Sequence, residues 1–554
     1  MGAPALGPGG GATPWRVSPM RRGARAPRRL PPAWTITAVL GLAYVIAAPP
    51  SSDLAAAAYR SELFSRVGFT LWDNSWYGGH HLPAYSLLAP ALGALLGPQL
   101  LAALSMTAAT ALFAALIDGY FPARATRVAS IFFAIGASIS LLSNRVPFDL
   151  GLAIALGALL AAQRERRALA LVLAPLSSLA SPVAGAFLAL AFLAWALAGP
   201  ERGWPAALAL AALVPVGLLT LVFPEGGTQP FAASAFYPEL AGALLIAVLL
   251  PSEQRVLRIG ALLYALALTG AYVLATPVGG NSDRLGALFG APLVACLLLG
   301  GSAIGRRHPR LLLLLVPVLL YWQANAPLTD FAAGRSDPAV NASYYAPLLG
   351  ELRALGVGYG ARPARIEVLP SVDHAEARWV APHVMIARGW ERQLDTLRNG
   401  LFYDESTALT AARYRAWLSA QAISYVALPD APLDYSGEDE ARLLRGAARP
   451  AYLRAVWRSP HWRLFAVAGA TPLVSPPGSL TQLDSDSFTL RAPRAGSYVV
   501  RVHFTSYWAL AGARGCVARA PGDWTAVQAR APGSLHVLIS FSLARVLGRG
   551  PRCS

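Results

Sequence analysis

The sequence contains no lysine, only three cysteines and few charged residues, and each shortage excludes a class of protein. Charged residues make up 14% of the 554 residues, whereas a soluble globular protein carries about 25%. A soluble enzyme, a disordered protein and a coiled coil are therefore excluded. Three cysteines are too few for a disulfide-stapled scaffold or a zinc site.

Because lysine is absent, the net charge of +17 comes entirely from arginine. A basic protein could bind nucleic acid. The arginines here stand between long apolar runs, so we expect a membrane partner and no nucleic acid. The abundance of Arg, Ala, Gly and Pro is typical of a GC-rich bacterial genome.

Apolar runs dominate the chain up to about residue 325, and 55% of all residues are hydrophobic. They predict an all-α polytopic membrane bundle of about eleven spans. The run 85–117 is too long for one straight crossing and is interrupted at Gly97-Pro98, so it is one span or two. The expected spans are 33–48, 85–117, 128–143, 147–162, 168–181, 183–199, 205–223, 239–251, 256–275, 285–303 and 310–324.

The arginine-rich segment 1–32 is expected to be a disordered cytoplasmic tail, followed by the membrane domain 33–325. One net crossing in 85–117 places the arginines of the short loops in the cytoplasm, as the positive-inside rule requires. The total number of crossings is then odd. The sequence therefore predicts a multi-pass protein of the bacterial cell membrane with an extracytoplasmic C-terminal half.

Beyond residue 325, charged and aromatic residues return at the density of a soluble protein. Alternating segments at 365–369 and 423–428 predict strands, and 411–421 predicts a helix. From Trp462 onward, short strand-like segments recur between Pro/Gly turns. We expect a mixed α/β region at 326–461 and a small β-sandwich at 462–554.

The first outer loop, 49–84, is the most informative segment. Asp53 follows the first span directly and begins a helical pattern that would lie on the membrane surface. A carboxylate in this place suits a lipid-linked substrate. A carboxylate that caps the helix explains the same pattern.

Paired histidines and glycines end this loop. Metal binding, substrate contact and structural hydrogen bonding are all open for His80 and His81, but adjacent side chains point apart in a regular backbone. Further candidate substrate contacts are Arg60, Asp73 and Glu225.

Charged residues also stand at the outer ends of two later spans. Arginine binds phosphate through two parallel hydrogen bonds, so a phosphate headgroup is a natural partner. A local ion pair is the alternative. The residues concerned are Arg145, Asp149, Asn281 and Arg284.

In the C-terminal half, Trp390 and Glu391 lie in a stretch with arginines and amides. An aromatic ring beside a carboxylate is typical of sugar binding. A solvated amphipathic helix would have the same composition.

The chain resembles the GT-C type integral-membrane glycosyltransferases, the relatives of protein O-mannosyltransferases, aminoarabinose transferases and arabinofuranosyltransferases. The resemblance rests on Asp53 after span 1, Leu82-Pro83-Ala84-Tyr85, the Asn144, Arg145 and Asp149 cluster, and an external domain after the spans. The stretches at 72–86 and 387–395 also resemble a group of actinobacterial membrane proteins. Many GT-C members carry two adjacent acids where this chain has Asp53 and Leu54.

The resemblance implies sugar transfer from a polyprenyl-phosphate donor to a saccharide or protein acceptor, with Asp53 as catalytic base or as ligand of a divalent metal. The cofactor requirement stays open. A transporter or flippase of a lipid-linked or small solute, and an envelope scaffold that binds polysaccharide, are the alternatives.

Cys516 and Cys553 fall in the C-terminal half. In an oxidising compartment we expect a disulfide between them that ties the last strand to the sandwich. Two free thiols are the alternative.

Overall fold

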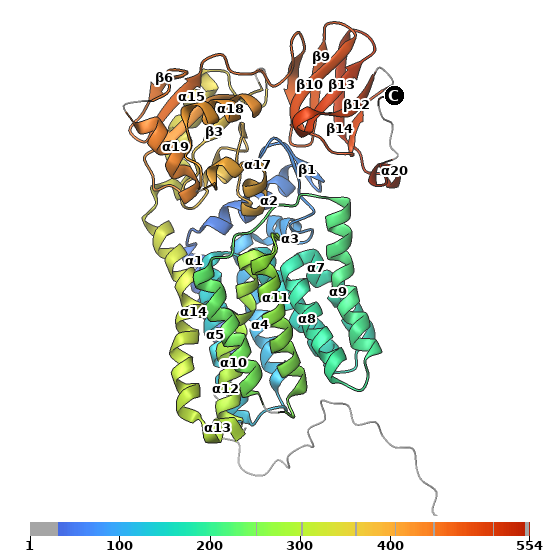
Figure 1. Cartoon of the computed structure of the whole chain (residues 1–554), viewed down its shortest axis with the longest axis vertical. Coiled ribbons are helices and arrows are strands. Elements are labelled where there is room, and N and C mark those ends of the chain that lie inside the picture. Colours follow the sequence, from blue (N-terminus) through green and yellow to red (C-terminus); the bar gives the residue numbers. More distant parts are fainter. Residues whose placement is uncertain are drawn as a thin grey trace, which may run out of the picture.

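The computed structural model describes residues 31–250, 252–300, 303–360, 363–404, 406–446, 449–512, 515–548 and 553. The expected tail at 1–32 therefore lies outside the described residues except for its last two. The described chain is mostly helical up to residue 336 and strand-rich towards its C-terminus (Figure 1). This confirms the coarse prediction of a helical bundle followed by a domain that contains strands.

Helices occupy all the apolar runs of the membrane half. They are α1 (Trp34–Ala47), α3 (Ala89–Leu96), α4 (Pro98–Ile117), α5 (Ala123–Ser140), α6 (Val146–Gln163), α7 (Arg167–Ala180), α8 (Pro182–Ala198), α9 (Gly203–Val222), α10 (Ala233–Leu249), α11 (Arg255–Val273), α12 (Asp283–Leu299), α13 (Ala303–Arg307) and α14 (Pro309–Ser336). Two short 3-10 helices, η1 (Leu141–Ser143) and η2 (Gly279–Ser282), precede α6 and α12.

Within the described residues, seven helical segments are long and apolar enough to cross a membrane, or eight if a bent pair is counted as one span. The chain is therefore built as a multi-pass membrane protein. The expected count of about eleven is not confirmed, because α7, α8 and α10 are apolar but only 14 to 17 residues long. A straight crossing takes about 20 residues.

The long run at 85–117 is divided where the sequence indicated. Gly97 has φ 82° and separates the eight-residue helix α3 from the 20-residue helix α4. At 1.5 Å per residue, α3 is too short to cross a membrane, so only α4 spans.

Helix α2 (Ser52–Val67) follows α1 after a bend of 77° and lies between the bundle and the C-terminal half (Figure 1). Its Tyr59 and Leu63 share a hydrophobic core with Tyr345 and Trp462. Glu62 forms an ion pair of 2.6 Å with Arg378. The helix expected on the membrane surface is thus also covered from outside by the C-terminal half.

The mixed α/β region begins later than expected, because α14 continues to Ser336. Its five-stranded sheet has the order β4-β3-β5-β7-β6, with β3 parallel to β4 and β5 and the other pairs antiparallel. The strands are β3 (Arg365–Val368), β4 (Met385–Ile386), β5 (Ile423–Pro429), β6 (Leu453–Arg458) and β7 (Trp462–Val467). The helices are α15 (Ala342–Ala354), α16 (Glu376–Trp379), α17 (Arg392–Arg398), α18 (Ala411–Ala420) and α19 (Tyr435–Arg445).

The sandwich boundary expected at 462 is wrong. Strand β7 pairs with β5 along five residues, so Trp462–Val467 completes the mixed sheet. The sandwich begins at β8, after a turn. The alternating pattern of β7 is like that of the sandwich strands, because the strands of both sheets bury one face.

The β-sandwich consists of two antiparallel sheets with the orders β11-β14-β9-β8 and β10-β13-β12. Side chains of both sheets, such as Phe488 and Val527, form one core. The elements are β8 (Ser479–Leu483), β9 (Ser487–Ala492), β10 (Gly496–His503), β11 (Trp508–Leu510), β12 (Gly515–Ala520), β13 (Trp524–Ala529), β14 (Gly533–Ile539) and the helix α20 (Leu543–Val546).

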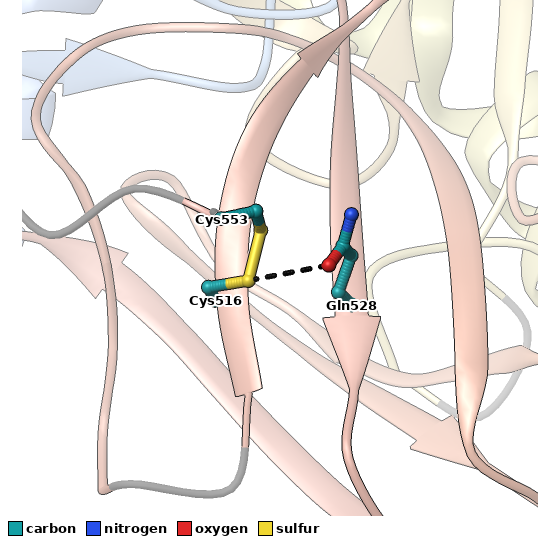
Figure 2. The surroundings of a disulfide bond; sticks show 3 residues. All are labelled: Cys516, Gln528 and Cys553. Atoms are coloured by element: carbon teal, nitrogen blue, oxygen red, sulfur yellow. Dashed lines mark hydrogen bonds between the residues drawn. A yellow bond between two sulfur atoms is a disulfide. The ribbon is translucent and has the colours of Figure 1, made fainter.

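A disulfide joins Cys516 on β12 to Cys553, with a Cα–Cα distance of 5.2 Å (Figure 2). That distance falls within the range of about 4.4–6.8 Å that disulfides adopt. The Cys516 sulfur also lies 3.6 Å from the side-chain oxygen of Gln528 on the neighbouring strand β13. The bridge ties the segment after α20 to the sandwich.

Candidate functional site

A buried asparagine holds two helix junctions together at the end of the bundle that faces the C-terminal half. Asn144 follows η1 in the left-handed conformation (φ 53°), which asparagine tolerates better than most residues. Its side-chain oxygen accepts a hydrogen bond from Tyr44, and its amide donates to the Ser51 hydroxyl at 2.9 Å. The corner between α5 and α6 is thereby tied to the bend between α1 and α2.

This tie brings Asp53 and Arg145 together. The Asp53 carboxylate lies 3.6 Å from Nε of Arg145, and both side chains are about one quarter exposed. Ser51 occupies the N-cap position of α2, and Asp53 lies inside the first turn. The carboxylate still benefits from the helix dipole there, but it faces Arg145 and remains accessible.

Arg284 belongs to the same cluster. It interacts electrostatically with Asp53 and is close enough to Arg145 for the two guanidinium groups to repel. The guanidinium carbon of Arg284 lies over the Phe148 ring, 5.1 Å from its centre. The guanidinium group also donates a hydrogen bond to the side-chain oxygen of Asn281. The sequence-predicted residues Asp53, Arg145, Asn281 and Arg284 are therefore brought together.

Asp149 completes this predicted set. It is fully buried, and neither of its carboxylate oxygens has a hydrogen-bond partner in the structure. It interacts electrostatically with Arg145 and Arg284. A buried carboxylate without hydrogen bonds is costly, so these two arginines are what stabilise it.

Asp330 is a member of the cluster that the sequence did not reveal. It lies near the end of α14, accepts a hydrogen bond of 3.0 Å from Ser143, and interacts with Arg145. A carboxylate a few residues beyond a long apolar run was the signal that could have identified it. Because the sequence predicted that this span ends at residue 324, Asp330 fell outside the predicted membrane segment.

A second polar group lies beside the first and involves the end of the first outer loop. Arg60 on α2 forms an ion pair of 2.7 Å with Glu391, and both side chains are largely buried. The Arg60 guanidinium also lies over the rings of Tyr85 and Trp76, at 4.1 Å and 5.2 Å. Because Tyr85 interacts with Asp53 as well as with Arg60, the two polar groups are continuous.

The predicted contact residues His81 and Glu225 form a third polar group, next to the Asp53 cluster and the Arg60–Glu391 pair. His81 Nδ1 lies 2.6 Å from the Glu225 carboxylate, which is also 3.3 Å from Arg398. Burial alone would raise the pKa of Glu225, but the hydrogen bond from His81 and the charge of Arg398 lower it to about 2. Glu225 is therefore held ionised.

His80 points the other way, as expected for adjacent residues of a strand. It belongs to β2 (His80–His81), which pairs with β1 (Trp72–Asp73), and it stacks on Trp76 with ring centres 5.5 Å apart. It is fully buried, and neither ring nitrogen has a hydrogen-bond partner. Burial, and then the charge of Arg60, lower its pKa to about 3.

Two predicted contact residues lie apart from these groups. Asp73 is fully buried and accepts hydrogen bonds from Tyr59 at 2.8 Å and from the Ser75 amide at 3.0 Å, so its oxygens are used within the loop. Trp390 stacks on His374 with ring centres 3.7 Å apart and carries Arg392 over its ring. Neither side chain joins the Asp53 cluster.

A divalent metal does not fit the residues that the structure describes. Among them, no group of three or more His, Cys, Asp and Glu side chains is placed to hold a metal ion. The histidines illustrate the reason, because His80 stacks on Trp76 while His81 turns its edge to Trp72.

An apolar cavity of about 390 Å³ lies within the bundle and is lined by α4, α6, α8, α10, α11, α12 and α14. Its wall includes Leu285 and Gly286, which follow Arg284 directly on α12. Glu239 and Tyr264, which are hydrogen-bonded to each other, form a polar spot in it. The cavity and the arginine cluster are thus adjacent along one helix.

Comparison with known proteins yields little. No family model matches the sequence, and no curated protein matches it. Among solved structures, the chain is similar to the cryo-EM structure of arabinofuranosyltransferase AftD from mycobacteria, with a TM-score of 0.43 and 16% identity. The match covers 84% of this chain and 40% of the length of that protein.

Proposed function

We propose that this protein is a membrane glycosyltransferase that moves a sugar from a polyprenyl-phosphate donor to a saccharide or protein acceptor. The observation that carries the proposal is the approach of the Asp53 carboxylate to Arg145, at 3.6 Å, with Arg284 in the same cluster. A base and two phosphate-binding groups are then present at one place beneath the C-terminal half.

The reaction assigns a separate role to each charge. Asp53 accepts the proton of the acceptor hydroxyl as that oxygen forms a bond to the sugar C1. The bond between C1 and the phosphate oxygen breaks, and its electron pair leaves with the polyprenyl phosphate. A general base of this kind contributes about 10²–10⁴-fold to the rate.

The two arginines act on the leaving group. Charge develops on the phosphate as the C1–O bond breaks, and preorganised cations stabilise such charge in a site with little water. Nε of Arg284 is buried and makes no hydrogen bond in the structure, so this donor is available to a phosphate oxygen. Nε of Arg145 faces Asp53 at 3.6 Å, and the charge of its guanidinium group acts on the phosphate.

The apolar cavity supports a lipid-linked donor. A phosphate at Arg284 would place the first isoprene units against Leu285 and Gly286, and the 390 Å³ of apolar space could hold part of the chain. A soluble sugar nucleotide would gain nothing from this wall, because its surface is polar. Two adjacent features of α12 therefore support a polyprenyl-phosphate donor.

The test replaces Asp53 with asparagine, which keeps the size of the side chain but removes the base. Membranes containing the wild-type protein are incubated with a panel of polyprenyl-phosphate sugars carrying labelled lipid, and released polyprenyl phosphate is measured. We expect D53N to lower the release rate by at least 100-fold at unchanged expression.

Glu62→Gln is the matched control, because Glu62 lies on the same helix but pairs with Arg378 outside the cluster. It should retain most of the wild-type rate. Release by D53N at the wild-type rate would return Asp53 to a purely structural role. Absence of release by the wild-type protein from every donor would contradict the proposed reaction itself.

A further inference from the structure

A cavity that does not include Asp53, Arg145 or Arg284 lies between the β-sandwich and the loops beneath it. Its volume is about 970 Å³, near the upper end of the range for ligand pockets. The sandwich contributes His503 and Trp524, the loop after α9 contributes Glu225, and α17 contributes Arg398. Three separate parts of the chain thus surround one space.

The arginines that line this cavity are already engaged within the protein, two of them in ion pairs. Arg398 pairs with Glu225 at 3.3 Å, and Arg519 pairs with Asp523 at 3.0 Å. Arg545 donates to two backbone carbonyls, those of Trp508 at 2.6 Å and Ser506 at 3.3 Å. An anionic ligand would have to break these pairs, so the lining favours a neutral one.

Three polar atoms of the lining are nevertheless buried with neither a hydrogen-bond partner nor an ion pair. They are Oε1 of Gln421, Nε2 of His503 and Nη1 of Arg398. Gln421 and His503 are only 9% and 7% exposed. Buried polar groups are normally hydrogen-bonded, so these atoms indicate a ligand that supplies the missing partners.

The three atoms have different hydrogen-bonding roles. The Gln421 oxygen accepts and the Arg398 nitrogen donates. His503 Nδ1 lies 3.2 Å from the Asp523 carbonyl and must donate to it, which leaves Nε2 as an acceptor. Burial, and then the charge of Arg398, lower the pKa of His503 to about 4, so the ring is neutral at neutral pH.

Aromatic side chains form part of the wall. Tyr507, Trp508 and Trp524 all line the cavity. Trp524 is held in place by His503, which stacks on it with ring centres 4.3 Å apart. Rigid aromatic surfaces suit the C–H faces of sugar rings, whereas hydroxyl groups both donate and accept hydrogen bonds.

We propose that this cavity is a binding site for a neutral saccharide, with Gln421, His503 and Arg398 as its hydrogen-bonding groups. The site is separate from the Asp53 cluster. Saccharide binding here requires no donor and no transfer, so the proposal stands or falls independently of the enzymatic function.

The experiment measures binding to the purified full-length protein in detergent by isothermal titration calorimetry. The probes are maltotriose, mannotriose and arabinotriose as neutral saccharides, with inorganic phosphate as the anionic comparison. We expect at least one trisaccharide to bind with a millimolar or lower Kd, and phosphate not to compete.

Variants locate the binding site. Gln421→Leu and His503→Phe should each weaken trisaccharide binding at least ten-fold, and Ala518→Phe should abolish it by filling the cavity. Gln482→Leu, an exposed glutamine on β8, is the matched control and should bind as the wild type does. Ala518→Phe leaves all the polar groups in place, so it tests the site even if a polar variant folds poorly.

Failure of all three trisaccharides to bind would overturn the proposal. Binding that survives all three cavity variants would overturn the location. Competition by inorganic phosphate would overturn the choice of a neutral ligand.

Discussion

His80 lies in an environment very different from that of a free side chain. It is fully buried against Trp76, and both of its ring nitrogens lack hydrogen-bond partners. Because burial disfavours the imidazolium form, the folded protein keeps this ring neutral down to a pH of about 3. The unfolded chain protonates the same ring below pH 6.5.

This difference predicts an acid-sensitive stability. His80 has a lower pKa in the folded state, so its contribution is complete above pH 6.5 and is lost as the pH falls from 6.5 towards 3. The loss should be on the order of 2 kcal/mol between pH 6.5 and pH 5. His80→Phe should melt at a temperature that changes less over this range than that of the wild type.

His308→Phe is the comparison for this measurement, because His308 is exposed at the start of α14. Its melting temperature should follow the wild-type pH profile. A profile of His80→Phe identical to that of the wild type would show that His80 does not cause the acid sensitivity.

The sequence could identify those site residues that are charged and stand directly beside a predicted span. Arg145, Asp149 and Arg284 are charges beside apolar runs, and such charges are costly unless they are paired or functional. The pairing of Arg60 with Glu391 could not be predicted, because it depends on how α2 docks under the C-terminal half. The place of Trp390 was unpredictable for the same reason, since its partner His374 comes from another segment.

At the scale of elements, the hairpin of β1 and β2 is determined by two glycines. Gly78 and Gly79 have φ values of 75° and 114°, which residues with a Cβ atom rarely adopt. A Cβ on Gly79 would lie 2.3 Å from the ring of Trp72. That ring belongs to the core of the β-sandwich, so it has no free space into which to move.

Gly79→Ala should therefore destabilise the protein more than backbone strain alone does. We expect strain of about 1–3 kcal/mol for a positive φ, with at least about 2 kcal/mol more from the clash. The measurement is the thermal midpoint in detergent. Gly97→Ala is the control, because Gly97 also has a positive φ (82°) but no atom lies within 4 Å of the place that an added methyl group would occupy. Equal losses in the two variants would exclude the clash.

Whether a segment forms a helix or a strand was predictable where its hydrophobic residues followed one clear period. The segments at 365–369, 423–428 and 411–421 form β3, β5 and α18 much as expected. What alternation cannot show is which sheet a strand joins, and β7 was therefore assigned to the sandwich. Its place beside β5 depends on contacts between distant parts of the chain.

For the whole molecule, the orientation in the membrane follows from where the arginines lie. Arg306 and Arg307 belong to α13, at the end of the bundle away from the C-terminal half (Figure 1). By the positive-inside rule, we expect that end to lie in the cytoplasm and the C-terminal half to lie outside.

Cysteine labelling on intact cells tests this orientation. Glu438→Cys introduces an exposed thiol on α19, which should react with an impermeant maleimide before lysis. The native cysteines should not interfere, because Cys296 is buried and the other two form the disulfide.

Glu201→Cys, in the exposed turn between α8 and α9, is the matched control and should react only after lysis. Labelling of the position 438 thiol only after lysis would reverse the orientation. It would also move the proposed reaction to the cytoplasmic face.

The core that α2 shares with the C-terminal half has a consequence for biosynthesis. Tyr59 and Leu63 leave the ribosome long before Tyr345 and Trp462, their partners in that core. At 5–20 residues per second, the roughly 280 to 400 intervening residues take about 14–80 s to synthesise. During that time the apolar face of α2 has no protein surface to cover it, and the neighbouring lipid is the nearest substitute. The membrane that the finished protein spans would thus first serve as a temporary partner for its earliest outer helix.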